Sequence, residues 1–327
     1  MIEDQKVILI QDGAIDELMS VVFLTTMPNV TLSLIDVVNA DCLGYPTYEV
    51  TWKILKMLKK SQTLVTMSNA RGLNPFPWSY RQYSMMVNLL PMINQYQNKV
   101  AIPKLVNTED VLHKQLVKQR ESGTKSTILC LGPLTDIANY IKSNPEYKNN
   151  FDSIVWMGGV YTPAKHKGPM MGNIDTGVAP GANPYAEWNA YWDPDAVNTI
   201  LKSGIDFKMF PLNVTNKVFL TPDIIRKHFI SESKTYPILD LAAQMYSMVA
   251  FQYGYSFWDT VTAAYLGKPD LFKFHTLNLS IDTSNDPSKQ GTISIDNENG
   301  FPVNVAKSVH VDRFYKYFVG QLKKIPQ

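Results

Sequence analysis

The chain has 327 residues, of which 45% are hydrophobic and 18% are charged, and its formal net charge is +2. This length and apolar content suit one large α/β domain or two ordinary ones. The nearly balanced charge and the lack of a Lys/Arg block argue against nucleic acid as a partner. Two cysteines, Cys42 and Cys130, are too few for a disulfide framework or a thiolate metal site. Because the start is not leader-like and no stretch of about 18 apolar residues occurs, we expect a soluble, cytoplasmic protein that does not enter a membrane.

The first candidate site lies at the end of the first apolar run. Val7–Ile10 predicts a buried strand that ends at Asp12, and Asp16 and Glu17 then open an amphipathic helix. Three carboxylates therefore converge on one strand-to-helix turn, where parallel sheets build their sites. In one interpretation the acids only complement a turn and a helix dipole. In the other, a hard cation with oxygen ligands lies among them, because acids this close together repel one another.

Strands and helices alternate along the rest of the chain. We expect strands at 31–38, 63–67, 126–131, 151–157 and 206–210, and helices at 47–60, 108–121, 133–141 and 194–201. A helical region at 223–248, a β-like region at 274–311 and a final helix follow. This alternation predicts a mostly parallel sheet. With no internal repeat and no linker, we expect a single domain over residues 1–327.

Two segments interrupt the alternation. Residues 69–98 are rich in proline and contain Phe76, Trp78 and Tyr80, which form either a packed lid or a platform for a flat ligand. Residues 161–185 form a long loop rich in glycine and proline, and loops of this length are usually functional or disordered.

Taken together, these separated stretches resemble the nucleoside hydrolases, which cleave the N-glycosidic bond of ribonucleosides to free base and ribose. The resemblance runs from the first strand to about Asp270. Each fragment alone is a weak signal, but the combination is specific. The matching stretches are Gln11-Asp12-Gly13 with Asp16, Asn39 to Asp41, Asn74-Pro75-Phe76-Pro77, Gly132-Pro133-Leu134, Met157-Gly158-Gly159, Ala186-Glu187-Trp188-Asn189 and Trp258-Asp259. The resemblance implies a doubly wound α/β sheet with helices on both faces and a Ca²⁺ ion at the strand ends.

The resemblance also implies a role for each matching residue. Asp12 matches a calcium ligand that is also the general base, and Glu17, the Leu131 carbonyl and Asp259 match the other calcium ligands. Asp16 matches an acceptor for a ribose hydroxyl. The expected substrate contacts are Asp16, Asn39, Phe76, Tyr80, Asn173, Glu187, Asn189 and Trp258. Such a set suits a ribosyl oxocarbenium transition state, which carboxylates and polarised hydroxyl contacts stabilise.

Two positions depart from the family signature Asp-X-Asp-X-X-X-Asp-Asp. The first Asp is Ile10 here, which removes an outer carboxylate that would orient the site. The last is Glu17, whose extra methylene Ca²⁺ tolerates better than Mg²⁺ does. Ala14 also stands where purine-preferring members have a polar side chain. These departures motivate an alternative function, a weakened or inactive homologue that binds a nucleoside or ribose.

The residue before Asp259 predicts which base leaves. Pyrimidine-accepting members have a His there as general acid, whereas this chain has Trp258, as in the purine-preferring branch, where two rings sandwich the base. Tyr80 matches the second ring, with Trp78 as an alternative two residues earlier; two rings packed in a core are the other interpretation. Asp41 matches an acid that contacts purine N7, so we assign it a catalytic role with Asp12 and Trp258. We therefore expect a purine nucleosidase.

Other functions and partners are weaker predictions. A phosphoryl-transfer enzyme would need a Gly-rich phosphate loop and a Lys partner, and the chain lacks both. Of the five histidines, only His166, in the long loop, has a modest prospect of reaching a ligand. A homodimer is plausible for the family, although nothing in the sequence decides the oligomeric state.

Overall fold

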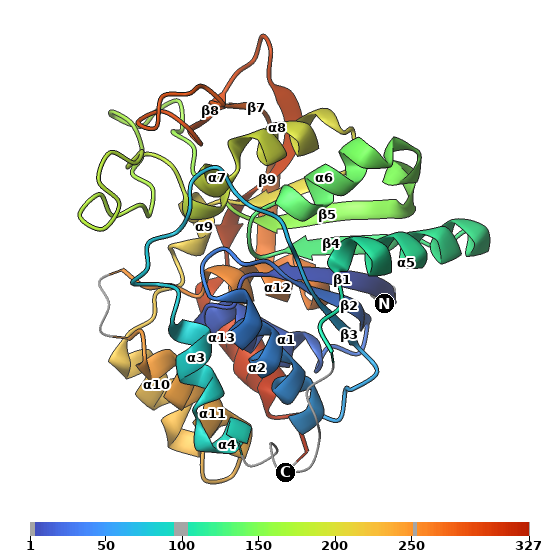
Figure 1. The fold of residues 1–327 in the computed structure, drawn as a ribbon. Helices are drawn as coiled ribbons and strands as arrows, with labels where there is room; N and C mark the ends of the chain where they lie inside the picture. Colours follow the sequence, from blue (N-terminus) through green and yellow to red (C-terminus); the bar gives the residue numbers. More distant parts are fainter. Residues whose placement is uncertain (1–3, 95–103, 251–253, 327) are drawn as a thin grey trace.

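The computed structural model describes residues 4–94, 104–250 and 254–326, which are built around one mixed sheet (Figure 1). Within these ranges the sheet has nine strands in the order β3-β2-β1-β4-β5-β6-β9-β7-β8. The strands are β1 (Gln5–Gln11), β2 (Val30–Val37), β3 (Leu64–Met67), β4 (Ser126–Cys130), β5 (Phe151–Met157), β6 (Phe207–Phe210), β7 (Phe272–Ile281), β8 (Ile293–Ile295) and β9 (Phe301–Val309).

The strands from β3 to β9 in this order pair in parallel, and only β7 pairs antiparallel, with β8 and β9. The sequence of β1 shows why the sheet is covered on both faces. Val7 and Leu9 belong to one buried cluster, and Ile8 and Ile10 to the other. A strand buried on both faces has no polar alternation, so the continuous apolar run was the correct signal for it.

Helices cover both faces of the sheet. On one face α1, α2, α11, α12 and α13 contribute to the first cluster, and on the other α5, α6 and α8 contribute to the second (Figure 1). The helices are α1 (Ile15–Leu24), α2 (Gly44–Met57), α3 (Tyr83–Asn88), α4 (Pro91–Asn94), α5 (Thr108–Ser122), α6 (Thr135–Ser143), α7 (Trp188–Trp192), α8 (Pro194–Lys202), α9 (Leu212–Thr215), α10 (Pro222–His228), α11 (Pro237–Ser247), α12 (Trp258–Gly267) and α13 (Val311–Leu322). The predicted doubly wound α/β class is confirmed.

The direction of the chain reverses beside β1. From β1 the chain proceeds outward to β2 and β3, and then returns to place β4 on the other side of β1. The loops that follow β1 and β4 therefore lead to helices on opposite faces of the sheet, α1 and α6. In open α/β sheets, a crevice forms at the carboxyl ends of strands at such a switch point, and ligands bind there.

Several predicted boundaries were wrong for local reasons. Pro133 precedes α6 by two residues instead of lying in its first turn. Residues 69–98 were expected to be irregular but contain α3 and α4, the latter beginning at Pro91, which the first turn of a helix accepts; 95–98 lie outside the described residues. The region 223–248 is two helices, because Pro237 cannot continue one and starts α11 instead.

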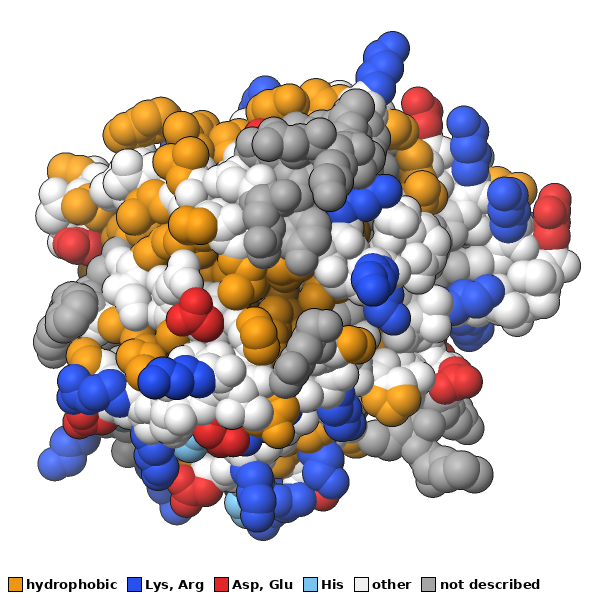
Figure 2. All heavy atoms as spheres, turned by 90° about the horizontal axis from the view of Figure 1, so that it is seen from below, with side chains coloured by type: hydrophobic (Ala, Val, Ile, Leu, Met, Phe, Trp, Pro, Cys, Tyr) orange, Lys and Arg blue, Asp and Glu red, His pale blue; other side chains and the backbone are white. Residues whose placement is uncertain are grey.

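Other parts of the chain match the prediction more closely. Residues 161–185 contain no helix or strand, as expected of a long loop. In the described residues, no helix combines the length and the apolar character needed to span a membrane. The surface seen from below Figure 1 carries patches of hydrophobic side chains with charged side chains of both signs around them (Figure 2).

Candidate active site

The turn after β1 places Asp12 at the switch point. Its side chain is 1% exposed, and its Oδ2 accepts a hydrogen bond of 3.1 Å from the backbone N–H of Asp41, which follows β2. Gly13 next to it has φ of +93°, and a Cβ there would lie 2.1 Å from Oγ1 of Thr47 on α2. Only glycine fits this turn, because both the backbone angle and the close approach of α2 exclude a side chain.

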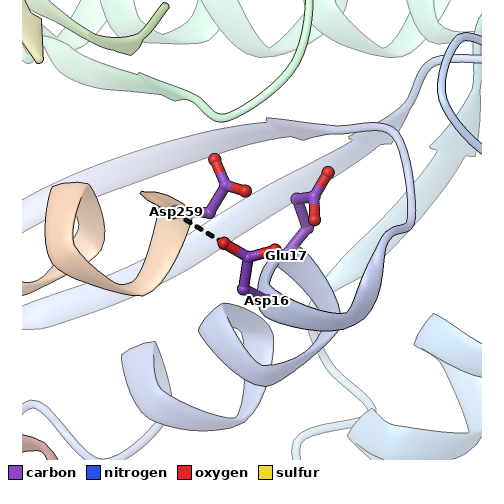
Figure 3. A group of neighbouring side chains, drawn as sticks. All are labelled: Asp16, Glu17 and Asp259. Carbon is purple, nitrogen blue, oxygen red and sulfur yellow. Dashed lines mark hydrogen bonds between the residues drawn. The ribbon is translucent and has the colours of Figure 1, made fainter. Parts of the chain in front are cut away.

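Three further acids gather beside this turn (Figure 3). Asp16 and Glu17 lie at the start of α1 and Asp259 lies at the start of α12, and each offers one carboxylate oxygen within 4.8 Å of the others. Asp16 accepts hydrogen bonds from the backbone N–H of Asp259, at 2.9 Å, and from the hydroxyl of Tyr255, at 2.7 Å. All three acids are buried, and the bond from the Asp259 N–H to Asp16 joins α12 to α1.

The electrostatics of this cluster fit a bound cation. Burial raises the pKa of Asp12 and Asp16, against hydrogen bonds that lower it. Burial together with the charges of neighbouring carboxylates raises the pKa of Glu17 and Asp259 well above the usual range. Glu17 Oε2 and Asp259 Oδ1 are buried and lack any hydrogen-bond partner. Orphaned, mutually repelling carboxylate oxygens are hard ligands of the kind that Ca²⁺ prefers.

The predicted metal ligands are only partly grouped. Glu17 and Asp259 lie together as expected, but the third member of the tight group is Asp16, to which we had assigned a sugar contact. Asp12 lies outside that group, although its charge helps to raise the pKa of Glu17. The Leu131 carbonyl accepts a hydrogen bond of 3.1 Å from the Asn189 amide.

Three of the residues expected to bind ribose, Asn173, Glu187 and Asn189, lie around the start of α7, beyond the ends of β4 and β5. Glu187 caps α7, accepting from the backbone N–H groups of Asn189, Ala190 and Gly159 at 2.9, 3.2 and 2.7 Å. Burial raises the pKa of Glu187 to about 7, against the opposing effect of these three donors. Asn173, in the long loop, accepts from the backbone N–H of Trp188 at 3.0 Å.

The predicted aromatic residues have different surroundings. Phe76 is buried and stacks on Trp188 at 4.9 Å, and Tyr80 meets Trp188 edge-on at 6.1 Å. Trp78 is 71% exposed. Trp258 is half-buried and packs against Tyr255 at 4.7 Å. In the part of the chain described, no ring contact joins Trp258 to Tyr80 or Trp78.

The segment after β2, which contains Asn39 and Asp41, is held by an arginine. Arg81 donates to the side chain of Asn39 and to the Ala40 carbonyl, both at 2.6 Å. Burial and the charges of Asp12 and Asp16 raise the pKa of Asp41, and the Arg81 charge opposes them. His166 is exposed and bonded within its own loop to the Gly168 carbonyl.

Sequence analysis missed three of these contributors: Arg81, Tyr255 and Trp188. Arg81 belongs to the irregular segment, where no pattern indicated that it would reach Asn39. Tyr255 lies in the aromatic run before α12, and Trp188 lies inside a matching stretch, so both had a signal nearby. Their partners come from distant elements, which the local pattern does not specify.

These features define a class of protein: a doubly wound α/β fold with a buried acidic site at its switch point. The chain belongs to the family described as inosine-uridine preferring nucleoside hydrolase, whose model matches residues 7–316. The predicted family resemblance is therefore confirmed.

Solved structures share the whole fold. The chain is similar to an inosine-uridine preferring nucleoside hydrolase from Bacillus anthracis, with a TM-score of 0.87 and 33% identity over 98% of this chain and 100% of that one. A purine-preferring ribonucleoside hydrolase from Gardnerella vaginalis has a TM-score of 0.75 at 21% identity, over 98% and 99% of the two chains. The second likeness concerns the fold alone.

Curated relatives match a shorter part of the chain. The non-specific ribonucleoside hydrolase RihC of Salmonella paratyphi A is 26% identical over 226 residues, or 69% of this chain and 66% of that protein. The enzyme of the same name from Escherichia coli O157:H7 is 30% identical over 203 residues, or 61% of each. Both matches span less than two thirds of the relatives' length.

Proposed function

We propose that this protein hydrolyses the N-glycosidic bond of purine ribonucleosides to free base and ribose. The observation that carries the proposal is the buried group of carboxylates at the switch point, in a chain of the nucleoside hydrolase family. A structural role alone would leave the orphaned oxygens of Glu17 and Asp259 unexplained, since buried polar atoms are usually paired.

Calcium is the cofactor that the donor set favours. Asp12, Glu17, Asp259 and the Leu131 carbonyl would hold it, and the second lone pair of that carbonyl remains available beside the bond from Asn189. A bound calcium ion supplies positive charge that orients the sugar diol and acidifies a water molecule. The flexible coordination of Ca²⁺ accommodates the longer side chain of Glu17.

The chain's own residues then carry the reaction. Asp12, held at Oδ2 by the Asp41 N–H, removes a proton from the attacking water as its oxygen bonds to the anomeric carbon. The bond between that carbon and the base nitrogen breaks, and its electron pair leaves with the base. Asp16, with Asn39, Asn173, Glu187 and Asn189, binds the sugar, and the ring of Phe76 supports the pocket through Trp188.

Purine preference rests on the residue before Asp259. Trp258 cannot donate a proton as His would, so the leaving base must accept its own proton, and purines do so at N7. Stacking on Trp258 and Tyr80 favours that cationic base by about 0.5 to 2 kcal/mol. Asp41, whose Oδ1 is buried and unpartnered and whose N–H donates to Asp12, would accept a hydrogen bond from the protonated N7 and so hold that proton on the purine.

The second candidate is an inactive homologue that binds the nucleoside. It is favoured by Ile10, which is 2% exposed in an apolar cluster where the family has a carboxylate. The absence of this outer acid would weaken the orientation of the site without abolishing binding.

The test is to incubate the calcium-loaded protein with inosine, adenosine, guanosine and uridine and to assay free ribose. We expect kcat/KM for the purine nucleosides to exceed that for uridine by at least about tenfold. Equal cleavage of uridine would overturn the purine assignment. Binding of inosine without base release, even on prolonged incubation, would favour the inactive homologue.

A further inference from the structure

The indole of Trp258 is held at its polar edge by a residue from another element. Its Nε1–H donates a hydrogen bond of 2.7 Å to Oδ1 of Asn216, which directly follows α9. Because the indole N–H is only a donor, the amide oxygen must face it. The indole N–H lies on the edge of the ring, so this hydrogen bond does not itself use an aromatic face.

A second contact restrains the same ring from the side. Tyr255 packs against Trp258 with ring centroids 4.7 Å apart and an angle of 60° between the planes. Tyr255 is itself fixed, because its hydroxyl donates to Asp16 in the acidic cluster. Burial and the Asp16 charge raise the pKa of this hydroxyl, so it remains a proton donor at neutral pH.

The backbone around both residues is also joined. The N–H of Phe257 donates to the Val218 carbonyl at 2.9 Å, and the N–H of Leu220 donates to the Tyr255 carbonyl at 3.0 Å. The segment after α9 is therefore fixed to the segment before α12. Asn216 and Trp258 face each other from a rigid framework and not from two independent loops.

We propose that Asn216 is a positioning residue that sets the orientation of the Trp258 ring for stacking on the leaving purine. This inference rests on the proposed nucleosidase function. The attraction between a ring face and a cationic base depends on how the ring is aligned. Without its acceptor, the indole would rotate about its side-chain bonds and lose that alignment.

The test compares Asn216→Leu, which removes the acceptor at similar size, with Asn216→Asp, which keeps it. We expect Asn216→Leu to lower kcat/KM for inosine about threefold to tenfold, the scale of one hydrogen bond, with most of the loss in kcat. Asn216→Asp should retain activity. Lys217→Leu, at the exposed next position, is the matched control and should behave like wild type.

A double-mutant cycle shows whether the effect passes through the indole N–H. Trp258→Phe removes that donor, so Asn216→Leu should cause no further loss in the Trp258→Phe background. An equal loss in both backgrounds would overturn the proposal. Asn216→Ala replaces Asn216→Leu if circular dichroism shows that the larger residue prevents folding.

The ¹⁵N-indole resonance of Trp258, assigned by its loss in Trp258→Phe, gives a readout that needs no substrate. Asn216→Leu should shift this resonance and speed its hydrogen exchange. If the resonance moves and wild-type turnover persists unchanged in Asn216→Leu, the positioning role is wrong while the nucleosidase function stands. If the wild-type protein releases no base from any nucleoside, the proposed function itself is overturned.

Discussion

Two of the groups of buried carboxyls in the described part of the chain have different surroundings. At the switch point, Glu17 and Asp259 have oxygens with no hydrogen-bond partner. On β2 and α6, Asp36 accepts from the Thr108 hydroxyl, and Asp136 accepts from the Ser68 hydroxyl at 2.6 Å. Burial raises the pKa of Asp36 well above its usual range, helped by the charge of Asp136.

The difference indicates what each group was built to hold. Burial raises the pKa of Asp136 to about 6 and raises that of Asp36 well above the usual range, so protonation relieves the repulsion between the two acids. The hydroxyls of Thr108 and Ser68 supply one partner to each acid, and Oδ2 of Asp136 is buried without a partner. The larger group at the switch point has fewer such donors and more acids, which is an arrangement for a metal cation. Neither burial nor a single unpartnered oxygen therefore distinguishes the two groups, whereas the gathering of three acids, two of them with an unpartnered oxygen, does.

The largest expected effect is on turnover, which should depend on the acids at the switch point and not on the acids of β2 and α6. Asp12→Ala should reduce turnover of inosine by more than about 10⁴-fold, because the base and the positioning of metal and water are lost together. Steady-state kinetics of the calcium-loaded protein measure this, with Asp136→Asn as the control from the other group. Turnover near that of wild type in Asp12→Ala would remove Asp12 from the mechanism.

The next largest expected effect is on the affinity for calcium. Glu17→Gln should weaken Ca²⁺ binding by about a hundredfold or more, since even outer contacts of a metal site contribute on the order of 10- to 100-fold. Isothermal titration calorimetry measures the affinity, and Glu121→Gln on the exposed end of α5 is the control. Indistinguishable titrations would show that Glu17 only complements the start of α1.

The third effect is on stability and depends on pH. A carboxyl whose folded pKa is about 6 instead of 3.8 loses stabilisation as the pH rises through that interval, because the folded state holds the proton longer. Asp136→Asn should therefore raise the free energy of unfolding at pH 7 by up to about 3 kcal/mol, with little difference from wild type near pH 4. Urea denaturation at both pH values tests this. A difference that does not change with pH would contradict the raised pKa of Asp136.

The smallest expected effect is a decrease in the free energy of unfolding, opposite in sign to that of Asp136→Asn. Thr108→Val keeps the shape of the side chain but removes the hydroxyl that serves Asp36 and Thr66. The loss should cost about 1 to 2 kcal/mol of stability at pH 7 and leave turnover unchanged. Urea denaturation beside a nucleosidase assay measures both quantities. Lost turnover without lost stability would mean that the second acidic group also serves the reaction.

The sequence predicted the parts of the molecule that local pattern determines. The strand at 151–157 was predicted residue for residue, because an apolar run buried on both faces differs clearly from its flanks. The acidic turn after β1 was predicted because the apolar run of that strand ends clearly at Asp12. The prediction for residues 223–248 was less accurate, since Pro237 divides the expected helical region into two helices.

The site was predictable only where its residues fall in short motifs. Asp16 and Glu17 are adjacent in sequence, and the resemblance supplied Asp259. The hydroxyl of Tyr255 reaches Asp16 across 239 residues, and nothing in either local pattern encodes that contact. The side-chain partners of Trp258 and Asn39 were missed for the same reason.

The bond between Asp16 and Asp259 also has a consequence for biosynthesis. The two residues are 243 positions apart, so the first acids leave the ribosome long before their partner exists. At 5 to 20 residues per second, the interval is roughly 12 to 50 seconds. During that time β1, β2 and β4 can already pair, with Asp12, Asp16 and Glu17 still open to water at the rim of a nascent sheet. The contact between Asp16 and α12 can form only after residue 259 has been made, so a cation held between Asp16, Glu17 and Asp259 would find all three acids together only late in synthesis.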